Sequence, residues 1–175
     1  MDDNDTMVFA YADPPYLGCG KRYAEHHQNA LQYDDPLEHK KLIERLCDEY
    51  PSGWSYSLSS VTLRTLLPFC PADVRVMAWI KPFVAFKGGV NPAYSWEPVI
   101  VRGGRRLGVY PKLRDFCSAS ITLKKGLTGA KPDDFWLWLF AIMGARTGDT
   151  FVDVFPGTGR GTEMWKRYVR QTSLF

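Results

Sequence analysis

The chain has 175 residues, of which 45% are hydrophobic and 14% aromatic, and its formal net charge is +3. This length and composition exclude a disordered protein and indicate one domain, spanning residues 1–175, with a substantial core. No apolar run approaches the ~20 residues of a membrane-spanning helix, and the acidic start differs from a signal peptide. The cysteines lack Cys-x-x-Cys spacing and the histidines lack ligand spacing. This predicts reduced thiols in a cytoplasmic protein and no metal site.

The first stretch with a chemical signature is Asp13-Pro14-Pro15-Tyr16. It follows residues 7–10, a short apolar run typical of a buried strand, and the two prolines end that strand abruptly. In open α/β sheets, ligands bind at the carboxyl ends of strands, which is where this motif is expected. The acid can accept from an amino group and the ring can stack on a planar heterocycle, which suits a flipped nucleobase. A Pro-Pro turn with a surface Asp is the alternative for this motif alone.

Predicted helices and strands alternate through the middle of the chain. Helices are expected over residues 36–50, 59–67 and 133–145. Strands are expected over residues 54–58, 74–80 and 96–101. This alternation predicts a three-layer α/β fold.

Three features of the same region break the regular pattern. Residues 21–35 are polar and without apolar spacing, which predicts a long mobile loop that closes over a bound base. Pro98 lies inside a predicted strand and indicates an edge strand or a bulge. Residues 103–129 are irregular and basic, and no element is predicted there.

A second motif lies near the carboxyl terminus. Residues 150–155 read as a buried strand, the turn Pro156-Gly157-Thr158-Gly159-Arg160-Gly161 follows at once, and a helix is predicted over residues 162–170. Strand, glycine turn and helix together let backbone N–H groups approach an anionic or polar cofactor. A glycine pair after a strand is by itself weak evidence for a cofactor site. The presence of the first motif in the same chain strengthens this prediction.

The two motifs together resemble those of the amino-methyltransferases, which methylate exocyclic nitrogens of bases with S-adenosylmethionine. Asp13-Pro14-Pro15-Tyr16 is similar to the catalytic motif, and Asp153-x-Phe155-x-Gly157-x-Gly159 to the cofactor motif, in circularly permuted order. Lys131-Pro132-x-x-Phe135 resembles the motif that precedes the cofactor strand in this order. The resemblance extends from about Val8 to Gly161. It implies a Rossmann-like class I methyltransferase fold, whose sheet is mostly parallel with one antiparallel strand.

The resemblance also implies the roles of individual residues. The Asp13 carboxylate and the Pro14 carbonyl would accept hydrogen bonds from the amino group, Pro15 would complete the rigid turn, and the ring of Tyr16 would stack on the base. The ring rather than the hydroxyl of Tyr16 is therefore expected to matter. The cofactor, S-adenosylmethionine, would be bound by Ala12, Lys131, Asp153, Phe155, Gly157 and Gly159. Asp153 would bind its amino group or orient the loop, and Lys131 would lie near its carboxylate.

An Asp at the first position of the catalytic motif implies N6 of adenine in DNA as the acceptor. Methylation of RNA adenine or of N4 of cytosine stays open, as does a catalytically silent nucleic-acid-binding subunit that needs a partner. In the family, a strand ending in an acid follows the cofactor-motif helix and binds the cofactor ribose. Residues 171–175 contain no acid. This departure predicts weak cofactor affinity or a different ribose ligand.

Basic residues supply the predicted contacts with double-stranded DNA. Residues 102–131 contain eight Lys and Arg side chains and one acid, Asp115. Such a basic segment is typical of a surface that neutralises the phosphates of a nucleic acid. The alternative interpretation is that these side chains are ordinary solvated surface charges. The candidate nucleic-acid ligands are Lys21, Arg22, Arg105, Arg106, Lys124 and Lys125. No separate target-recognition domain is visible, so loops around the site are expected to contact DNA in a bacterial or host cytoplasm. A homodimer and a partner subunit are both compatible with the sequence.

Overall fold

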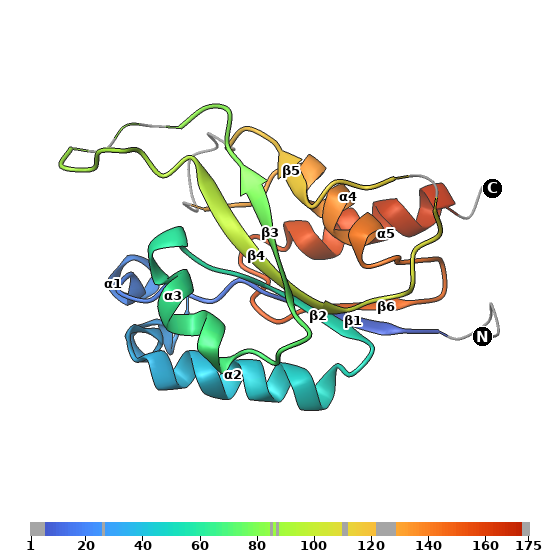
Figure 1. The fold of residues 1–175 in the computed structure, drawn as a ribbon, viewed down its shortest axis with the longest axis horizontal. Coiled ribbons are helices and arrows are strands. Elements are labelled where there is room, and N and C mark those ends of the chain that lie inside the picture. The colour runs from blue at the N-terminus through green and yellow to red at the C-terminus, as the bar shows by residue number, and fades with distance from the viewer. Residues whose placement is uncertain are drawn as a thin grey trace.

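A six-stranded β-sheet organises the protein (Figure 1). The computed structural model describes residues 6–25, 27–84, 86, 88–109, 112–121 and 129–172. In sheet order the strands are β5 (Phe116–Ser118), β3 (Arg75–Ile80), β4 (Trp96–Gly103), β2 (Gly53–Ser57), β1 (Val8–Ala12) and β6 (Thr150–Asp153). Strand β4 is antiparallel to both of its neighbours, and the other pairs are parallel. The predicted mostly parallel sheet with one antiparallel strand is confirmed.

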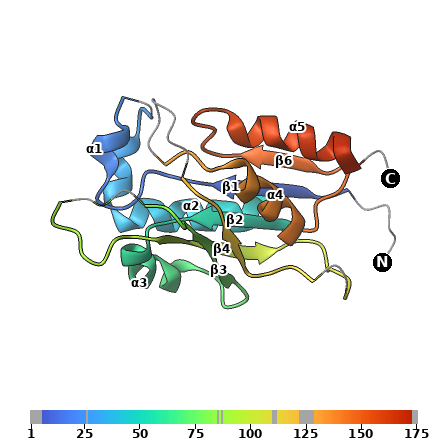
Figure 2. The same ribbon diagram turned by 90° about the horizontal axis from the view of Figure 1, so that it is seen from above.

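Helices cover both faces of the sheet (Figures 1 and 2). The α-helices are α1 (Gly20–Tyr23), α2 (Pro36–Glu49), α3 (Leu63–Leu66), α4 (Asp133–Ile142) and α5 (Arg160–Thr172). Short 3-10 helices are η1 (Ala30–Asp34), η2 (Ser60–Thr62) and η3 (Leu67–Phe69). Helices α2 and α3 lie on one face, and α4 and α5 lie on the other, as the three-layer prediction requires. None of the helices in the described ranges has the length and apolar composition of a membrane span.

Alternation along the strands divides the core into two layers. In β1, Phe9 and Tyr11 belong to the cluster that packs against α4 and α5, whereas Ala10 and Ala12 belong to the cluster that packs against α2. Successive side chains of a strand point to opposite faces, so a strand buried on both faces is apolar throughout. The small residues of β1 thus face α2, and its large rings face the aromatic helix α4.

The direction of the strands collects several chain segments at one edge of the sheet. The five parallel strands all end there, and the antiparallel β4 begins there, because Trp79 of β3 pairs with Glu97 of β4. Strands β1 and β6 are adjacent and in register, with Tyr11 opposite Asp153. The residues that follow these two strands, which carry the two sequence motifs, therefore lie side by side.

The segment after the first motif differs from the predicted loop. It contains α1 and η1, which are tied together when the Gly20 N–H donates to the Asp34 carboxylate at 2.9 Å. A Cβ at Gly20 would lie 2.7 Å from the Ala30 carbonyl oxygen, so only glycine permits this approach. His27 and Tyr33 then pack their rings against Phe155 of the second motif. Residues 21–35 were predicted as a long mobile loop without helices or strands, whereas they contain parts of two short helical segments that long-range contacts hold in place.

The position of Pro98 was also predicted wrongly. Strand β4 lies inside the sheet between β3 and β2, not at its edge. Pro98 is tolerated because β2 ends opposite its neighbour Val99, so the sheet needs no N–H at this point. The Pro98 carbonyl still accepts from the Leu58 N–H at 3.3 Å. Strand β5, within the region where no element was predicted, completes the sheet beside β3.

A buried ion pair lies at the opposite end of the strands, next to the amino ends of β1 and β6. Arg105 donates to both carboxylate oxygens of Asp149, at 2.9 and 3.0 Å, and to the Gly144 carbonyl at 3.0 Å. The backbone N–H groups of Met7 and Arg146 also donate to this carboxylate. Burial alone would raise the pKa of Asp149, but these hydrogen bonds outweigh it and lower the pKa. The proposed phosphate ligand Arg105 is thus committed to a structural contact remote from the first motif.

We expect Asp149→Asn to destabilise the protein by about 3 kcal/mol at neutral pH, because it leaves the Arg105 charge buried without its partner. The carboxyl is only 2% exposed. Since its pKa is lowered in the fold, the wild-type advantage is present above the ordinary Asp range and disappears as the pH falls through the native pKa. Urea unfolding at pH 7 and at pH 3 measures both effects.

The matched control is Asp73→Asn, which removes the exposed Arg102–Asp73 pair, whose acid is 63% exposed. We expect its stability to be close to that of wild type. Equal losses for the two variants would show that the Arg105 pair is no more than a surface contact.

Candidate functional site

Both sequence motifs line one cavity of about 990 Å³ at the carboxyl ends of the parallel strands. From the first motif it is lined by Asp13, Pro14, Pro15 and Tyr16, and from the second by Asp153, Phe155, Pro156, Gly157 and Thr158. The start of β4, the end of β3, the segment that follows β2 and residues of α1 and α4 also line it. The volume is that of a site for one or two small molecules or a cofactor with a nucleobase.

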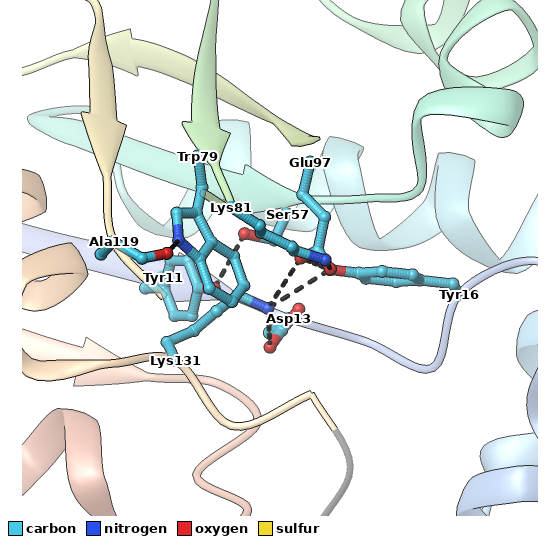
Figure 3. A network of polar contacts seen from close by, with 9 residues as sticks. All are labelled: Tyr11, Asp13, Tyr16, Ser57, Trp79, Lys81, Glu97, Ala119 and Lys131. Atoms are coloured by element: carbon cyan, nitrogen blue, oxygen red, sulfur yellow. Dashed lines mark hydrogen bonds and ion pairs between the residues drawn. The ribbon is translucent and has the colours of Figure 1, made fainter. Parts of the chain in front are cut away.

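A buried polar network occupies the centre of this cavity wall (Figure 3). The Lys131 ammonium lies 2.7 Å from Asp13 Oδ2, 3.2 Å from the Tyr16 hydroxyl and 3.4 Å from Glu97 Oε2. The Tyr16 hydroxyl donates to the same Glu97 oxygen at 2.7 Å. Glu97 also forms an ion pair with Lys81 through its other oxygen. Glu97 therefore contacts two ammonium groups, and Lys131 contacts two carboxylates.

Aromatic side chains support the network from the α4 face. Tyr11 exchanges a hydrogen bond with Ser57 at 2.8 Å and packs edge-on against Trp136, with ring centroids 4.9 Å apart. Trp79 donates from Nε1 to the Ala119 carbonyl at 2.8 Å, and the Lys131 ammonium lies 5.5 Å from its ring centroid. The charged groups are thus embedded in a rigid apolar setting, where their electrostatic interactions are stronger than in water.

Burial and opposite charges set the protonation of the network. Burial raises the pKa of Asp13, although the Lys131 ammonium opposes this shift. Burial would also raise the pKa of Glu97, but Lys131 and Lys81 outweigh it and the pKa is lowered. For Lys131, burial would lower the pKa, and the charges of Asp13 and Glu97 raise it well above its ordinary value. Burial and the same two carboxylates raise the pKa of Tyr16, so its hydroxyl stays protonated and donates.

The glycine turn forms the other side of the cavity. The Gly159 N–H donates to the Pro156 carbonyl at 2.6 Å, and the Gly159 carbonyl accepts from Glu163 in the first turn of α5. Gly157 and Gly159 have φ values of +46° and +73°, in the left-handed region that glycine adopts most readily. Helix α5 begins directly after this turn, at Arg160, and the first N–H groups of a helix lack partners within it and carry the positive end of its dipole.

Asp153 has a carboxylate oxygen that accepts no hydrogen bond within the described structure. It is the last residue of β6, and this oxygen is its buried Oδ1. Burial raises its pKa to about 6, and the nearby Asp13 charge adds to this effect. A Cβ on Gly161 would lie 2.5 Å from its Oδ2, so the glycine at this position lets α5 approach the carboxyl. Such an acceptor is suited to a cationic or hydrogen-bond-donating ligand group.

The structure places the predicted cofactor residues unequally. Asp153, Phe155 and Gly157 line the cavity, whereas Ala12 is fully buried in the core beneath it. Lys131, predicted beside the methionine carboxylate, lines the same cavity, and its ammonium is bonded to Asp13 and Tyr16 of the first motif. Its side chain is only 3% exposed.

The structure describes four of the predicted nucleic-acid residues, and they lie in two places. Arg22 lines the cavity, and Lys21 is exposed on the same helix α1. Arg105 is bonded to Asp149 at the amino ends of β1 and β6, and Arg106 is exposed next to it. Lys124 and Lys125 lie outside the described residues.

Sequence reasoning assigned no role in the site to Glu97 or Lys81. Each lies at the end of β4 or β3 that faces the cavity, and their contact depends on the antiparallel pairing of those strands. A charged residue at the border of an apolar strand was the available signal. It became informative only once the direction of β4 was known.

Comparison with known proteins supports the fold. The chain is similar to the crystal structure of an M1.HpyAVI–SAM complex, with a TM-score of 0.57 and 14% sequence identity. The match covers 94% of this chain and 80% of that chain. This likeness confirms the predicted Rossmann-like arrangement of the sheet. No protein-family profile matches the chain, and no curated protein matches it in sequence.

The raised pKa of Asp153 predicts that this site costs stability. In the protein without ligand, we expect Asp153→Asn to be more stable than wild type at pH 7.5, by up to about 3 kcal/mol, since one pKa unit corresponds to about 1.4 kcal/mol. Wild type loses stability as the pH rises from the ordinary Asp value to the native value of about 6. Urea unfolding at pH 4 and pH 7.5 measures this, and a gap of the same size at both values would exclude titration as the cause.

Proposed function

We propose that this protein transfers a methyl group from S-adenosylmethionine to the exocyclic N6 of adenine in DNA. The observation that carries the proposal is the meeting of two distant motifs in one cavity. Asp13 and Asp153 are separated by 140 positions (153 − 13), yet they follow neighbouring parallel strands and line the same space. The first motif offers an acceptor for an amino group. The second offers a glycine turn and a carboxyl, that of Asp153, with one oxygen that has no hydrogen-bond partner in the described structure.

The chemistry of the second motif fits S-adenosylmethionine. Asp153 Oδ1 is a buried acceptor without a partner, as the amino group of the methionine part requires. Gly157 allows the backbone to pass close to this part of the molecule, and the start of α5 offers N–H groups for a carboxylate. Phe155 presents an apolar ring to the same cavity. The similar M1.HpyAVI structure is itself a SAM complex. When bound, the cofactor supplies an electrophilic methyl group on a sulfonium.

The first motif fits an aromatic amino group. The lone pair of such a nitrogen is delocalised into the ring, so the protein must hold the nitrogen in line and favour a pyramidal geometry. Asp13 can accept from this amino group because its side chain is 23% exposed toward the cavity while one oxygen is held by Lys131. Accepting one N–H localises electron density on the nitrogen. Pro14 contributes a carbonyl as a second acceptor, and the Tyr16 ring offers a stacking surface.

Adenine in DNA is the acceptor that the Asp of the first motif favours. An N4-cytosine or RNA substrate uses the same amino-group chemistry, and a silent subunit would keep the cavity without turnover. Wild-type protein is therefore incubated with isotopically labelled S-adenosylmethionine and either DNA or RNA. The nucleic acid is digested and its nucleosides are identified by mass spectrometry. N6-methyldeoxyadenosine supports the proposal, whereas methylcytidine, methylated RNA or no product contradicts it.

Two variants separate the acceptor side from the cofactor side. We expect Asp13→Ala to abolish transfer while binding of S-adenosylhomocysteine stays within a few-fold of wild type. We expect Gly157→Val to abolish that binding, because a branched side chain is strained at a φ of +46° beside the cavity. Titration calorimetry measures the binding and circular dichroism checks the fold. Normal turnover in Asp13→Ala would exclude this acid from the reaction.

A further inference from the structure

We propose that Glu97 and Lys131 are positioning residues that hold Asp13 and Tyr16 in the geometry that receives the acceptor base. This inference rests on the proposed function, since it names the groups that prepare its acceptor site. Its physical basis is the buried network of Figure 3, in which Lys131 contacts Asp13 and Tyr16, and Glu97 contacts Tyr16 and Lys131.

The four charged groups come from separate parts of the chain. Asp13 follows β1 and Lys81 follows β3. Glu97 is the second residue of β4, and Lys131 precedes α4. Each of these segments is anchored by the sheet or by α4 and not by the network itself. A contact among them therefore fixes the cavity end of one element relative to the others.

Stability alone is a poor explanation for this arrangement. The side chains of Lys131, Glu97 and Lys81 are 3%, 13% and 12% exposed, so the fold must strip water from three charges. Well-packed apolar residues often stabilise such a site equally well or better. Buried charges in a cavity that holds candidate reacting groups more often serve the site itself.

The hydroxyl of Tyr16 is the group most directly controlled. It donates to Glu97 at 2.7 Å and accepts from Lys131 at 3.2 Å, so both of its hydrogen-bonding roles are filled. A ring anchored at its far end cannot tilt freely in the cavity. The orientation of any stacking surface is then set by the hydroxyl, which differs from the expectation that the ring alone matters.

Glu97 has two effects in the network: it balances the charge of the two lysines, and it anchors the hydroxyl of Tyr16. Without Glu97, the ammonium groups of Lys81 and Lys131 lose the carboxylate that both contact. Lys131 then keeps Asp13 as its remaining acidic partner, and the Tyr16 hydroxyl loses its acceptor. The anchoring of Tyr16 and the neutrality of the cluster both depend on Glu97, but a second substitution can restore only the neutrality.

This difference gives a test that separates positioning from folding. Glu97→Leu, which leaves no acceptor for the Tyr16 hydroxyl, is compared with the double variant Glu97→Leu/Lys81→Met, in which one buried cation is removed together with the anion. We expect the double variant to regain the urea midpoint that Glu97→Leu loses. We expect kcat to stay about 100-fold below wild type in both, because small misplacements of reacting groups cost about this factor. KM for S-adenosylmethionine should change little.

Lys81→Met alone is the control for removing a buried cation whose polar contact in the network of Figure 3 is with Glu97 and not with Asp13 or Tyr16. We expect its kcat to fall less than that of Glu97→Leu. Recovery of kcat together with stability in the double variant would overturn the proposal, since Glu97 would then act only through the fold. A loss confined to KM for the cofactor would overturn it as well.

A second readout does not depend on turnover. In protein labelled with 3-fluorotyrosine, the fluorine signal of residue 16 is identified by its absence in Tyr16→Phe. Burial, Asp13 and Glu97 raise the Tyr16 pKa, so Glu97→Leu should lower that pKa and broaden or split the signal. An unchanged signal and titration would refute the positioning role. If wild type transfers no methyl group, the proposed function fails, and this measurement still decides whether Glu97 holds Tyr16.

Discussion

The contact between Lys131 and Asp13 is the one on which the arrangement of the site depends. It joins the loop after β1 to the segment before α4 across the cavity wall, at 2.7 Å. A buried ammonium is expensive unless carboxylates surround it, and here Asp13 and Glu97 supply two. Because each carboxylate is fixed by a different strand, the lysine can be satisfied only when these strands keep their places. The ion pair therefore couples the sheet to the first motif.

The two sides of the cavity use opposite strategies for their acids. Asp13 and Glu97 are bonded to lysines before any ligand binds, although burial still leaves the pKa of Asp13 raised. Asp153 has an oxygen without a partner in the described structure and a pKa raised to about 6, so its environment favours a ligand that donates hydrogen bonds or carries positive charge. One side is organised in advance, and the other gains from binding. A site for a cationic cofactor beside a neutral acceptor would have this asymmetry.

Local patterns in the sequence were sufficient for much of the architecture. The apolar runs before Asp13 and Gly157 predicted β1 and β6, and Pro36 marked the start of α2, since all three signals depend on a few neighbouring residues. Glu97 could not be assigned in this way, because its partners Lys81 and Lys131 are brought near only by the antiparallel pairing of β4. Arg105 was misinterpreted for a similar reason. Its basic neighbours suggested phosphate contacts, whereas its partner Asp149 lies 44 positions away.

The distribution of polar contacts over the sheet explains how such a site is tolerated. At the amino ends of β1 and β6, Asp149 receives four hydrogen bonds from Arg105, Met7 and Arg146, and its pKa is lowered. At the carboxyl ends of the same two strands, the pKa values of Asp13 and Asp153 are raised. Ionisation of an acid thus stabilises the fold at one end and opposes it at the other. Because β1 and β6 are short and directly paired, the ion pair at their amino ends helps to hold in register the strands that present the costly carboxyls to the cavity.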